Sequence, residues 1–464
     1  MPLRVELIGV LVDSGAMKKL VAALMLALLA FAQPVQAQSI LRDAETEALL
    51  TDMTRPLIIA AGLRPQDVQV VMINDPSLNA FVAGGQIVFI HSGTIQGADN
   101  ANEVQGVIAH ELGHIVGGHV SLADRGFRPA LGISILSMVL GIAAAVAGAG
   151  EAAAAVFGAG QQAATLNYLS FSRDQEASSD AAGARFLNDA GITGKGYLSF
   201  FGKLTQMEYR YGISRKDNFM MSHPVSSERI ANLTDTLKAA PAWNKPSDPA
   251  IEERFRRVQA KLAGYVNEMN RTLQQYPPQN QSVYAHYARA YAYHKGGYPD
   301  KANAEADALV ARAPHDPYFL EVKGQILLES GKPREALAPL REATVSTNYS
   351  PLIATTFGHA LIATEDSANY PEAERVLRLA VGRDDENPFA WYQLGVIYER
   401  KGDTARALLA TAERASLTGD LRTAAYSARG ALAGLPPNTP DWIRAQDIAL
   451  AAQNQMQDAG KKRR

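Results

Sequence analysis

The sequence predicts a mainly α-helical protein with a small β-sheet, in which an α+β domain is followed by an α-solenoid. Two short β-branched runs, residues 68–75 and 86–93, lie among longer stretches with the apolar spacing of amphipathic helices. Further along the chain, helical units begin at Pro317, Pro351 and Pro388, with spacings of 34 and 37 residues. Such a repeat is typical of stacked helix pairs, none of which can bury its apolar face alone.

Length and composition narrow the range of functions. With 464 residues the chain is long enough for two folded units and a leader. The net charge of -2, from 47 acids and 45 bases, gives no electrostatic reason to expect a nucleic-acid partner. Because the chain has no cysteine, disulfides, thiolate metal sites and cysteine nucleophiles are excluded. Only histidines and carboxylates remain as zinc ligands.

The N-terminal residues 1–37 are interpreted as a leader. Residues 17–37 combine two lysines, an apolar run and small residues before a cleavage point after Ala37, which is the pattern of a signal peptide. We expect residues 1–16 to lie upstream of the true start at Met17. The apolar run is shorter than the ~20 residues of a membrane span, so export to the periplasm is expected rather than a permanent anchor.

Residues 38–237 are expected to form the α+β domain. Its first helix is predicted over residues 41–62, and a turn or short strand is predicted over residues 79–85 between the two β-branched runs. A further helix is expected to open near Asn102 and to end at about His119. This helix carries the main chemical motif of the chain.

A segment without any charge covers residues 129–150. Its length alone makes it a candidate membrane span. Its richness in glycine and alanine, with the similar residues 152–160 after it, favours instead a helical hairpin that packs on the domain or contacts a membrane surface.

A proline-containing linker is predicted at residues 238–250, and the repeats occupy residues 251–464. The unit that begins at Pro388 has the pattern W-x2-L-G-x2-Y of tetratricopeptide repeats, with the small Ala407 where its two helices would cross. We therefore expect a concave groove for protein or peptide segments.

His110, Glu111 and His114 form H-E-x-x-H. On a helix, side chains four residues apart point to the same side, so both imidazoles can bind one zinc ion, while Glu111 lies close enough to act on a water molecule beside it. His119 is a candidate for the third ligand. It stands one residue short of the position that one large class of zinc peptidases uses, and on a continuing helix it would face away from His110. We therefore assign His119 a structural role.

The third ligand must come from elsewhere, and a carboxylate is chemically sufficient. Glu176 and Asp180 lie four residues apart on a helix predicted to end near Gly191. Glu176 can complete a His2Glu set, and Asp180 can accept a hydrogen bond from a ligand imidazole. Acids with this spacing are common on solvated helices, so the prediction depends on the upstream motif.

Three segments in order, "HELGH", "SRDQEASSDAAGARFLNDAG" and "MSHPVSSERIANL", resemble the family of zinc peptidases that includes the CAAX prenyl protease and the HtpX heat-shock protease. With a signal peptide and C-terminal repeats, the chain is most similar to the periplasmic BepA branch. The resemblance covers nearly all of residues 40–430, and it implies a gluzincin-type peptidase domain.

The resemblance also implies site residues. His110, His114 and Glu176 would hold one Zn2+ per chain, with Glu111 as the general base and Asp180 as the partner of a ligand. The resemblance adds His223, either as a regulatory fourth ligand that blocks the site or as a catalytic group that stabilises the oxyanion.

The function expected from these features is a periplasmic zinc endopeptidase for misassembled envelope proteins, in particular outer-membrane β-barrel proteins. The repeats would dock these substrates or their assembly machinery, and an extended substrate could pair with the strand edge at residues 85–90. Two alternatives remain open. One is a chaperone or adaptor with latent proteolysis, and the other is an integral-membrane peptidase.

Overall fold

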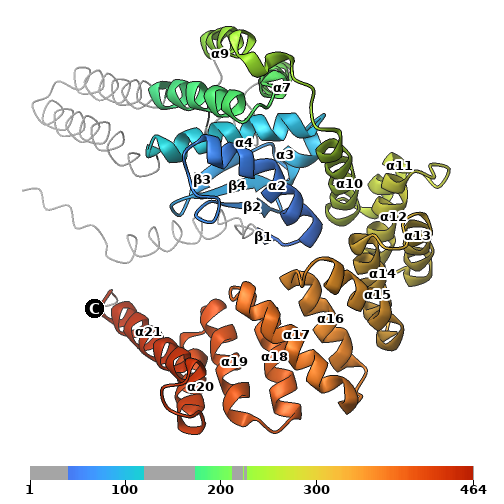
Figure 1. The fold of residues 1–464 in the computed structure, drawn as a ribbon, viewed down its shortest axis with the longest axis vertical. Coiled ribbons are helices and arrows are strands. Elements are labelled where there is room, and N and C mark those ends of the chain that lie inside the picture. The colour runs from blue at the N-terminus through green and yellow to red at the C-terminus, as the bar shows by residue number, and fades with distance from the viewer. Residues whose placement is uncertain (1–39, 120–172, 212–222, 224–226, 463–464) are drawn as a thin grey trace, which may run out of the picture. The chain divides into compact units, whose positions relative to one another are not determined.

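The computed structural model describes residues 40–119, 173–211, 223 and 227–462 (Figure 1). The expected signal peptide and the apolar segment at 129–160 lie outside the described residues. In the part of the chain that is described, no helix is both long and apolar enough to cross a membrane.

A four-stranded sheet with the strand order β1-β2-β4-β3 forms one layer of the first domain. Its strands are β1 (Ile40–Leu41), β2 (Gln69–Ile73), β3 (Ala80–Ala83) and β4 (Ile87–His91). β2 and β4 run parallel, while β1 and β3 are antiparallel to their neighbours. The two β-branched runs thus form β2 and β4, and the segment between them forms the short strand β3.

Helices share one apolar core with this sheet, in one layer that contacts the strands and a second layer that lies over the first (Figure 1). They are α2 (Ala44–Ala60), α3 (Ser92–Gly97), α4 (Ala101–Val116), the helical residues 173–189, α7 (Lys195–Tyr211) and α9 (Ser227–Ala239). The core includes Ile90 of the sheet, Ile108 of α4 and Phe200 of α7, and all three are fully buried. Burying such apolar side chains is the main favourable contribution to folding.

Local signals explain where α4 begins and ends. The side chain of Asn100 accepts a hydrogen bond from the backbone N–H of Glu103, which satisfies one of the free donors of the first turn. The helix ends at Val116, earlier than the expected end near His119. Gly118 adopts a φ of 64°, a left-handed conformation that glycine tolerates and that turns the chain away from the helix axis.

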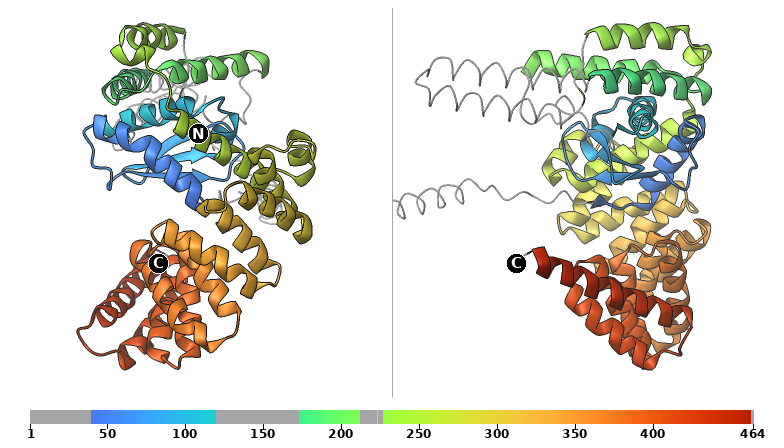
Figure 2. Two further views of the ribbon diagram at one scale, coloured as in Figure 1. Left: turned by 45° about the vertical axis from the view of Figure 1, so that its right-hand side comes forward. Right: turned by 90° about the vertical axis from the view of Figure 1, so that its left-hand side faces the viewer.

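The second half of the described chain is a series of antiparallel helix pairs (Figure 2). After α10 (Pro249–Val266) and α11 (Met269–Gln275) come α12 (Val283–Lys295), α13 (Pro299–Arg312), α14 (Pro317–Glu329), α15 (Pro333–Ser346), α16 (Pro351–Ala363), α17 (Tyr370–Arg383), α18 (Pro388–Arg400), α19 (Thr404–Leu417), α20 (Leu421–Gly434) and α21 (Pro440–Lys462). From α12 onward each helix packs against the next one, as in a tetratricopeptide-repeat solenoid.

A glycine recurs at the eighth position of α14, α16 and α18, where the two helices of a pair cross. A Cβ atom at Gly324 would lie 2.4 Å from Cγ of Leu340, and one at Gly358 would lie 2.5 Å from Cγ of Leu377. These contacts are shorter than van der Waals distances allow, so only glycine permits the observed helix separation. Gly324 and Gly358 therefore meet the same packing constraint, whereas a Cβ atom at Gly395 would lie at an ordinary distance of 3.5 Å from Cβ of Ala410.

The segment between the two halves is compact. It contains the 3-10 helix Pro241–Asn244, after which α10 begins directly at Pro249. Phe255 and Val258 of α10 are buried in the same core as the sheet. The first helix after the predicted linker is thus held by apolar contacts to the sheet domain.

Candidate metal centre

Two crossing helices bring the predicted site residues together. His110, Glu111 and His114 lie on α4, and Glu176 lies on the helix at residues 173–189. A Cβ atom at Gly113 would lie 2.7 Å from the backbone oxygen of Ser179, so the absence of a side chain at Gly113 allows the two helices to approach closely.

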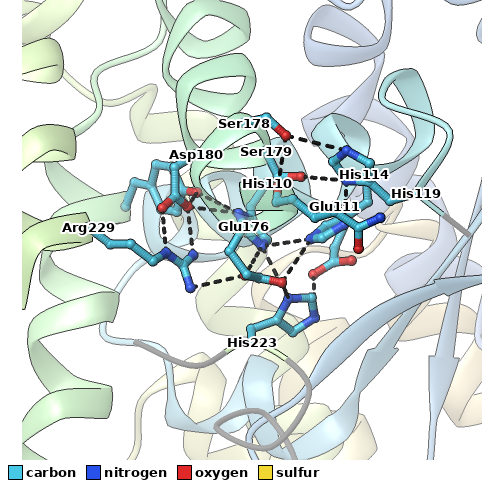
Figure 3. A network of polar contacts seen from close by, with 12 residues as sticks. His110, Glu111, His114, His119, Glu176, Ser178, Ser179, Asp180, His223 and Arg229 are labelled. Carbon is cyan, nitrogen blue, oxygen red and sulfur yellow. Dashed lines mark hydrogen bonds and ion pairs between the residues drawn. The ribbon is translucent and has the colours of Figure 1, made fainter. Parts of the chain in front are cut away.

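Four side chains, His110, His114, Glu176 and His223, converge on one buried point (Figure 3). Nε2 of His110 lies 3.1 Å from Nε2 of His114 and 3.3 Å from Oε2 of Glu176. Nδ1 of His223 lies 3.0 Å from Oε1 of Glu176 and 3.3 Å from Nε2 of His110. Ligand atoms at about 2.1 Å from a tetrahedral zinc ion are roughly 3.4 Å apart, so this donor set fits zinc in both chemistry and spacing.

The electrostatics of the cluster favour a cation. Although burial opposes a charge on His110, hydrogen bonds to Asp180 and Glu176 raise its pKa to about 10. Burial next to His110 and His223 lowers the pKa of His114 to about 2, which keeps this imidazole neutral, as a metal ligand must be. The carboxylates of Glu176 and Asp180 therefore favour positive charge at this point, and a bound metal ion would take the place of the proton on His110.

Asp180 contacts the side of His110 that faces away from the cluster. Its Oδ1 lies 3.0 Å from Nδ1 of His110 and accepts a hydrogen bond of 2.9 Å from the hydroxyl of Tyr197. With Nδ1 donating to a carboxylate, Nε2 of His110 is left to bind a metal ion. Asp180 thus lies beside the imidazole of His110, on the side opposite the cluster.

Arg229, on α9, is a part of the site that sequence reasoning missed, as is Tyr197 on α7. The guanidinium donates to Oδ2 of Asp180 at 2.7 Å and to Oδ1 at 2.9 Å, and it also lies 3.0 Å from Oε2 of Glu176. The side chain is 6% exposed. The quoted segment "MSHPVSSERIANL" contains Arg229, but an isolated arginine on a helix carries no signal that it will be buried against acids far away in sequence.

Glu111 is fully buried, and neither of its carboxylate oxygens has a hydrogen-bond partner among the described residues. Oε1 lies 3.5 Å from Nε2 of His223. Burial raises the pKa of the carboxyl, while the neighbouring His223 and His110 oppose this effect. A carboxylate with a raised pKa and free acceptor oxygens can take up a proton from a water molecule beside the cluster.

His119 is outside the four-residue cluster, but it does not face away from it. Because α4 ends at Val116, the assumption of a continuing helix fails, and Nδ1 of His119 lies 3.0 Å from Nδ1 of His114.

The expectation that residues 85–90 offer a free strand edge to a substrate needs a correction as well. β4 pairs with β2 on one side and with β3 on the other, so residues 87–91 have no free edge, and the edge strand next to α4 is β3.

The fold and the site define a metalloendopeptidase with one zinc ion per chain, in which a helical H-E-x-x-H segment and a glutamate from a second helix meet. The chain belongs to peptidase family M48, whose profile matches residues 44–237. The metalloprotease LoiP of Escherichia coli (strain K12) is 31% identical over 197 residues, which are 42% of this chain and 73% of LoiP.

Two longer relatives extend the similarity into the repeats. The beta-barrel assembly-enhancing protease of Yersinia pestis is 24% identical over 366 residues, which are 76% of this chain and 72% of the relative. The protein with the same name from Escherichia coli (strain K12) is 24% identical over 360 residues, which are 75% of this chain and 71% of the relative.

Proposed function

We propose that this zinc endopeptidase works in the periplasm on misassembled outer-membrane β-barrel proteins. The observation that carries the proposal is that one chain combines the buried cluster around His110 with a solenoid of helix pairs. The name beta-barrel assembly-enhancing protease, borne by relatives that match 76% and 75% of the chain, supports this substrate class.

In this proposal His110, His114 and Glu176 hold the metal. When bound, zinc supplies Lewis acidity that polarises a peptide carbonyl and lowers the pKa of water to about 7. Glu111 accepts the proton of the attacking water and delivers it to the leaving nitrogen. Its unpartnered oxygens support this role, because a carboxylate that is occupied by strong hydrogen bonds would be a weaker base.

His223 has two proposed roles that follow from its position. With Nδ1 near both His110 and Glu176, it can occupy the fourth place in the donor set and so keep the resting enzyme inactive. Displaced from that place, it can donate a hydrogen bond to the oxyanion. Asp180 is proposed to hold His110 in the tautomer that binds zinc.

An extended substrate is proposed to pair with β3, the edge strand beside α4, because backbone pairing selects unfolded segments over folded ones. The repeats are proposed to hold the remainder of the substrate or the assembly machinery. A groove of about 640 Å³ supports this role, and it is lined both by residues within 40–46 at the start of the peptidase domain and by residues of the repeats. It is lined by Tyr265 and Phe389, which are 49% and 45% exposed, together with Leu352.

The replacement Glu111→Gln tests the proposal against the alternative of a chaperone or adaptor with latent proteolysis. It keeps the size of the side chain but removes the base. In a deletion strain, we expect this variant to leave misassembled β-barrel proteins undegraded. If it restores every defect of the deletion strain, proteolysis is not the main function, and binding by the repeats is.

The domain limits and the location of the protein are also proposals. Residues 17–37 are proposed as the signal peptide, 38–237 as the peptidase domain, 238–250 as the linker and 251–464 as the repeat domain. N-terminal sequencing of the mature protein from a periplasmic extract should begin at Gln38. A periplasmic protein that still begins at Met17 would contradict cleavage of the proposed signal peptide.

Residues 129–160 are proposed to contact a membrane surface. Carbonate at high pH should then release the protein from membranes, because a surface contact does not resist alkaline extraction. Retention in the membrane fraction would favour the alternative of an integral-membrane peptidase.

A further inference from the structure

The turn after α4 places His119 against the metal centre. Gly117 has a φ of -69° and Gly118 has a φ of 64°, so the chain makes a turn directly after the helix. The imidazole of His119 then lies over Gly117, where an added Cβ atom would be 2.4 Å from its Nε2. The backbone of Gly117 would accept any residue, so its lack of a side chain serves the position of His119.

His119 contacts both helices that supply the proposed metal ligands (Figure 3). Its Nδ1 lies 3.0 Å from Nδ1 of His114 on α4 and 3.2 Å from Oγ of Ser179. Its Nε2 lies 3.3 Å from Oγ of Ser178. The rings of His114 and His119 are nearly perpendicular, at 79°, with centroids 5.0 Å apart.

The donors and acceptors around His119 define one consistent direction of hydrogen bonding. The hydroxyl of Ser178 donates to the backbone oxygen of Gln175 at 2.9 Å, so its oxygen is free to accept from Nε2–H of His119. In that tautomer Nδ1 of His119 has a lone pair, which can accept the proton on Nδ1 of His114. Nε2 of His114, which lies 3.1 Å from Nε2 of His110, is then left without a proton and can bind a metal ion.

We propose that His119 is a positioning residue that holds His114 in the tautomer and the orientation required for binding zinc. His119 accepts a hydrogen bond from Nδ1–H of His114, as Asp180 does from Nδ1–H of His110, but the acceptor is a neutral ring instead of a carboxylate. The inference rests on the proposed role of His114 as a ligand. It gives His119 a function although it is not a ligand itself.

The test is the zinc dissociation constant of the full-length chain, measured by competition with a chelator. We expect His119→Ala to weaken zinc binding by about 10–100-fold, the usual effect of losing the hydrogen-bond partner of a ligand. His119→Asn should recover most of the affinity, because the amide oxygen of asparagine stands near the position of Nδ1. His294→Ala is the matched control, since His294 pairs with Glu329 in the repeats, and it should bind zinc as the wild type does.

Gly117→Ala provides an independent variant that leaves His119 in the sequence. The added methyl group should displace the imidazole and weaken zinc binding to a similar extent. Combined with His119→Ala, it should cause no further loss, because there is then no ring to displace. If His119→Ala does not fold, as judged by circular dichroism, the comparison of His119→Asn with Gly117→Ala decides the question.

Two results would overturn the inference. One is that His119→Ala binds zinc as tightly as the wild type. The other is that Gly117→Ala weakens binding equally with and without His119. A wild-type chain that binds no zinc would instead contradict the proposed metal site itself, so the two failures can be told apart.

Discussion

Replacing Arg229 with methionine would remove the guanidinium that contacts the buried carboxylates of Asp180 and Glu176. Three contacts of 2.7, 2.9 and 3.0 Å would be lost, and the two acids are only 7% and 3% exposed. Removing one partner of a buried ion pair costs about 3–5 kcal/mol, because the other charge remains buried without compensation. The equilibrium constant for opening of the metal-free domain should therefore increase by roughly a hundred-fold to a few thousand-fold.

Hydrogen exchange of the amides of α4, measured with a chelator present, reports this change for the peptidase domain alone. The matched control is Arg254→Met. Arg254 pairs with Asp52 at 2.7 Å, but these side chains are 30% and 53% exposed, so its loss should cost only about 0–1 kcal/mol. If Arg229→Met changes the protection of α4 no more than Arg254→Met does, Arg229 does not stabilise the site in the way described.

Three further changes test other parts of the molecule. Glu111→Gln should retain zinc but lower kcat by roughly 10²–10⁴-fold, the usual contribution of a general base; a variant with full activity would show that another group takes the proton. His114→Ala should bind zinc much more weakly, and peptidase activity lost on chelation should return with added zinc only in the wild type; equal recovery in the variant would remove His114 from the ligand set. Gly358→Ala should lower the stability of the repeats by about 1–3 kcal/mol, because the new methyl group would meet Leu377, while zinc affinity stays unchanged; unchanged melting of the repeats would contradict the packing account.

Much of the fold follows from local patterns that are visible in the sequence. The helices α14, α16 and α18 begin at Pro317, Pro351 and Pro388, because proline is suited to the first turn of a helix and cannot continue one. The last of these units contains the W-x2-L-G-x2-Y pattern, whose glycine lies where the paired helix crosses. Such signals need only neighbouring residues, so they can be recognised without knowing the tertiary structure.

The residues of the peptidase site could be predicted only in part from such local patterns. The four-residue spacing of His110 and His114 puts both rings on one side of a helix, and the sequence alone shows this. That Glu176 approaches them depends on the crossing of two helices, which the contact between Gly113 and Ser179 permits. No periodicity in the sequence encodes that crossing.

The sequence by itself determined the class of chemistry, since an H-E-x-x-H helix in a chain without cysteines leaves histidines and carboxylates to hold a metal ion. Only the tertiary structure decided which other side chains support that site. Tyr197 and Arg229 come from helices far along the chain, and His119 reaches His114 because the chain turns at Gly118. These contacts arise from packing between segments that are distant in sequence. The residues next to a side chain in the sequence therefore do not show which side chains it will contact in the folded protein.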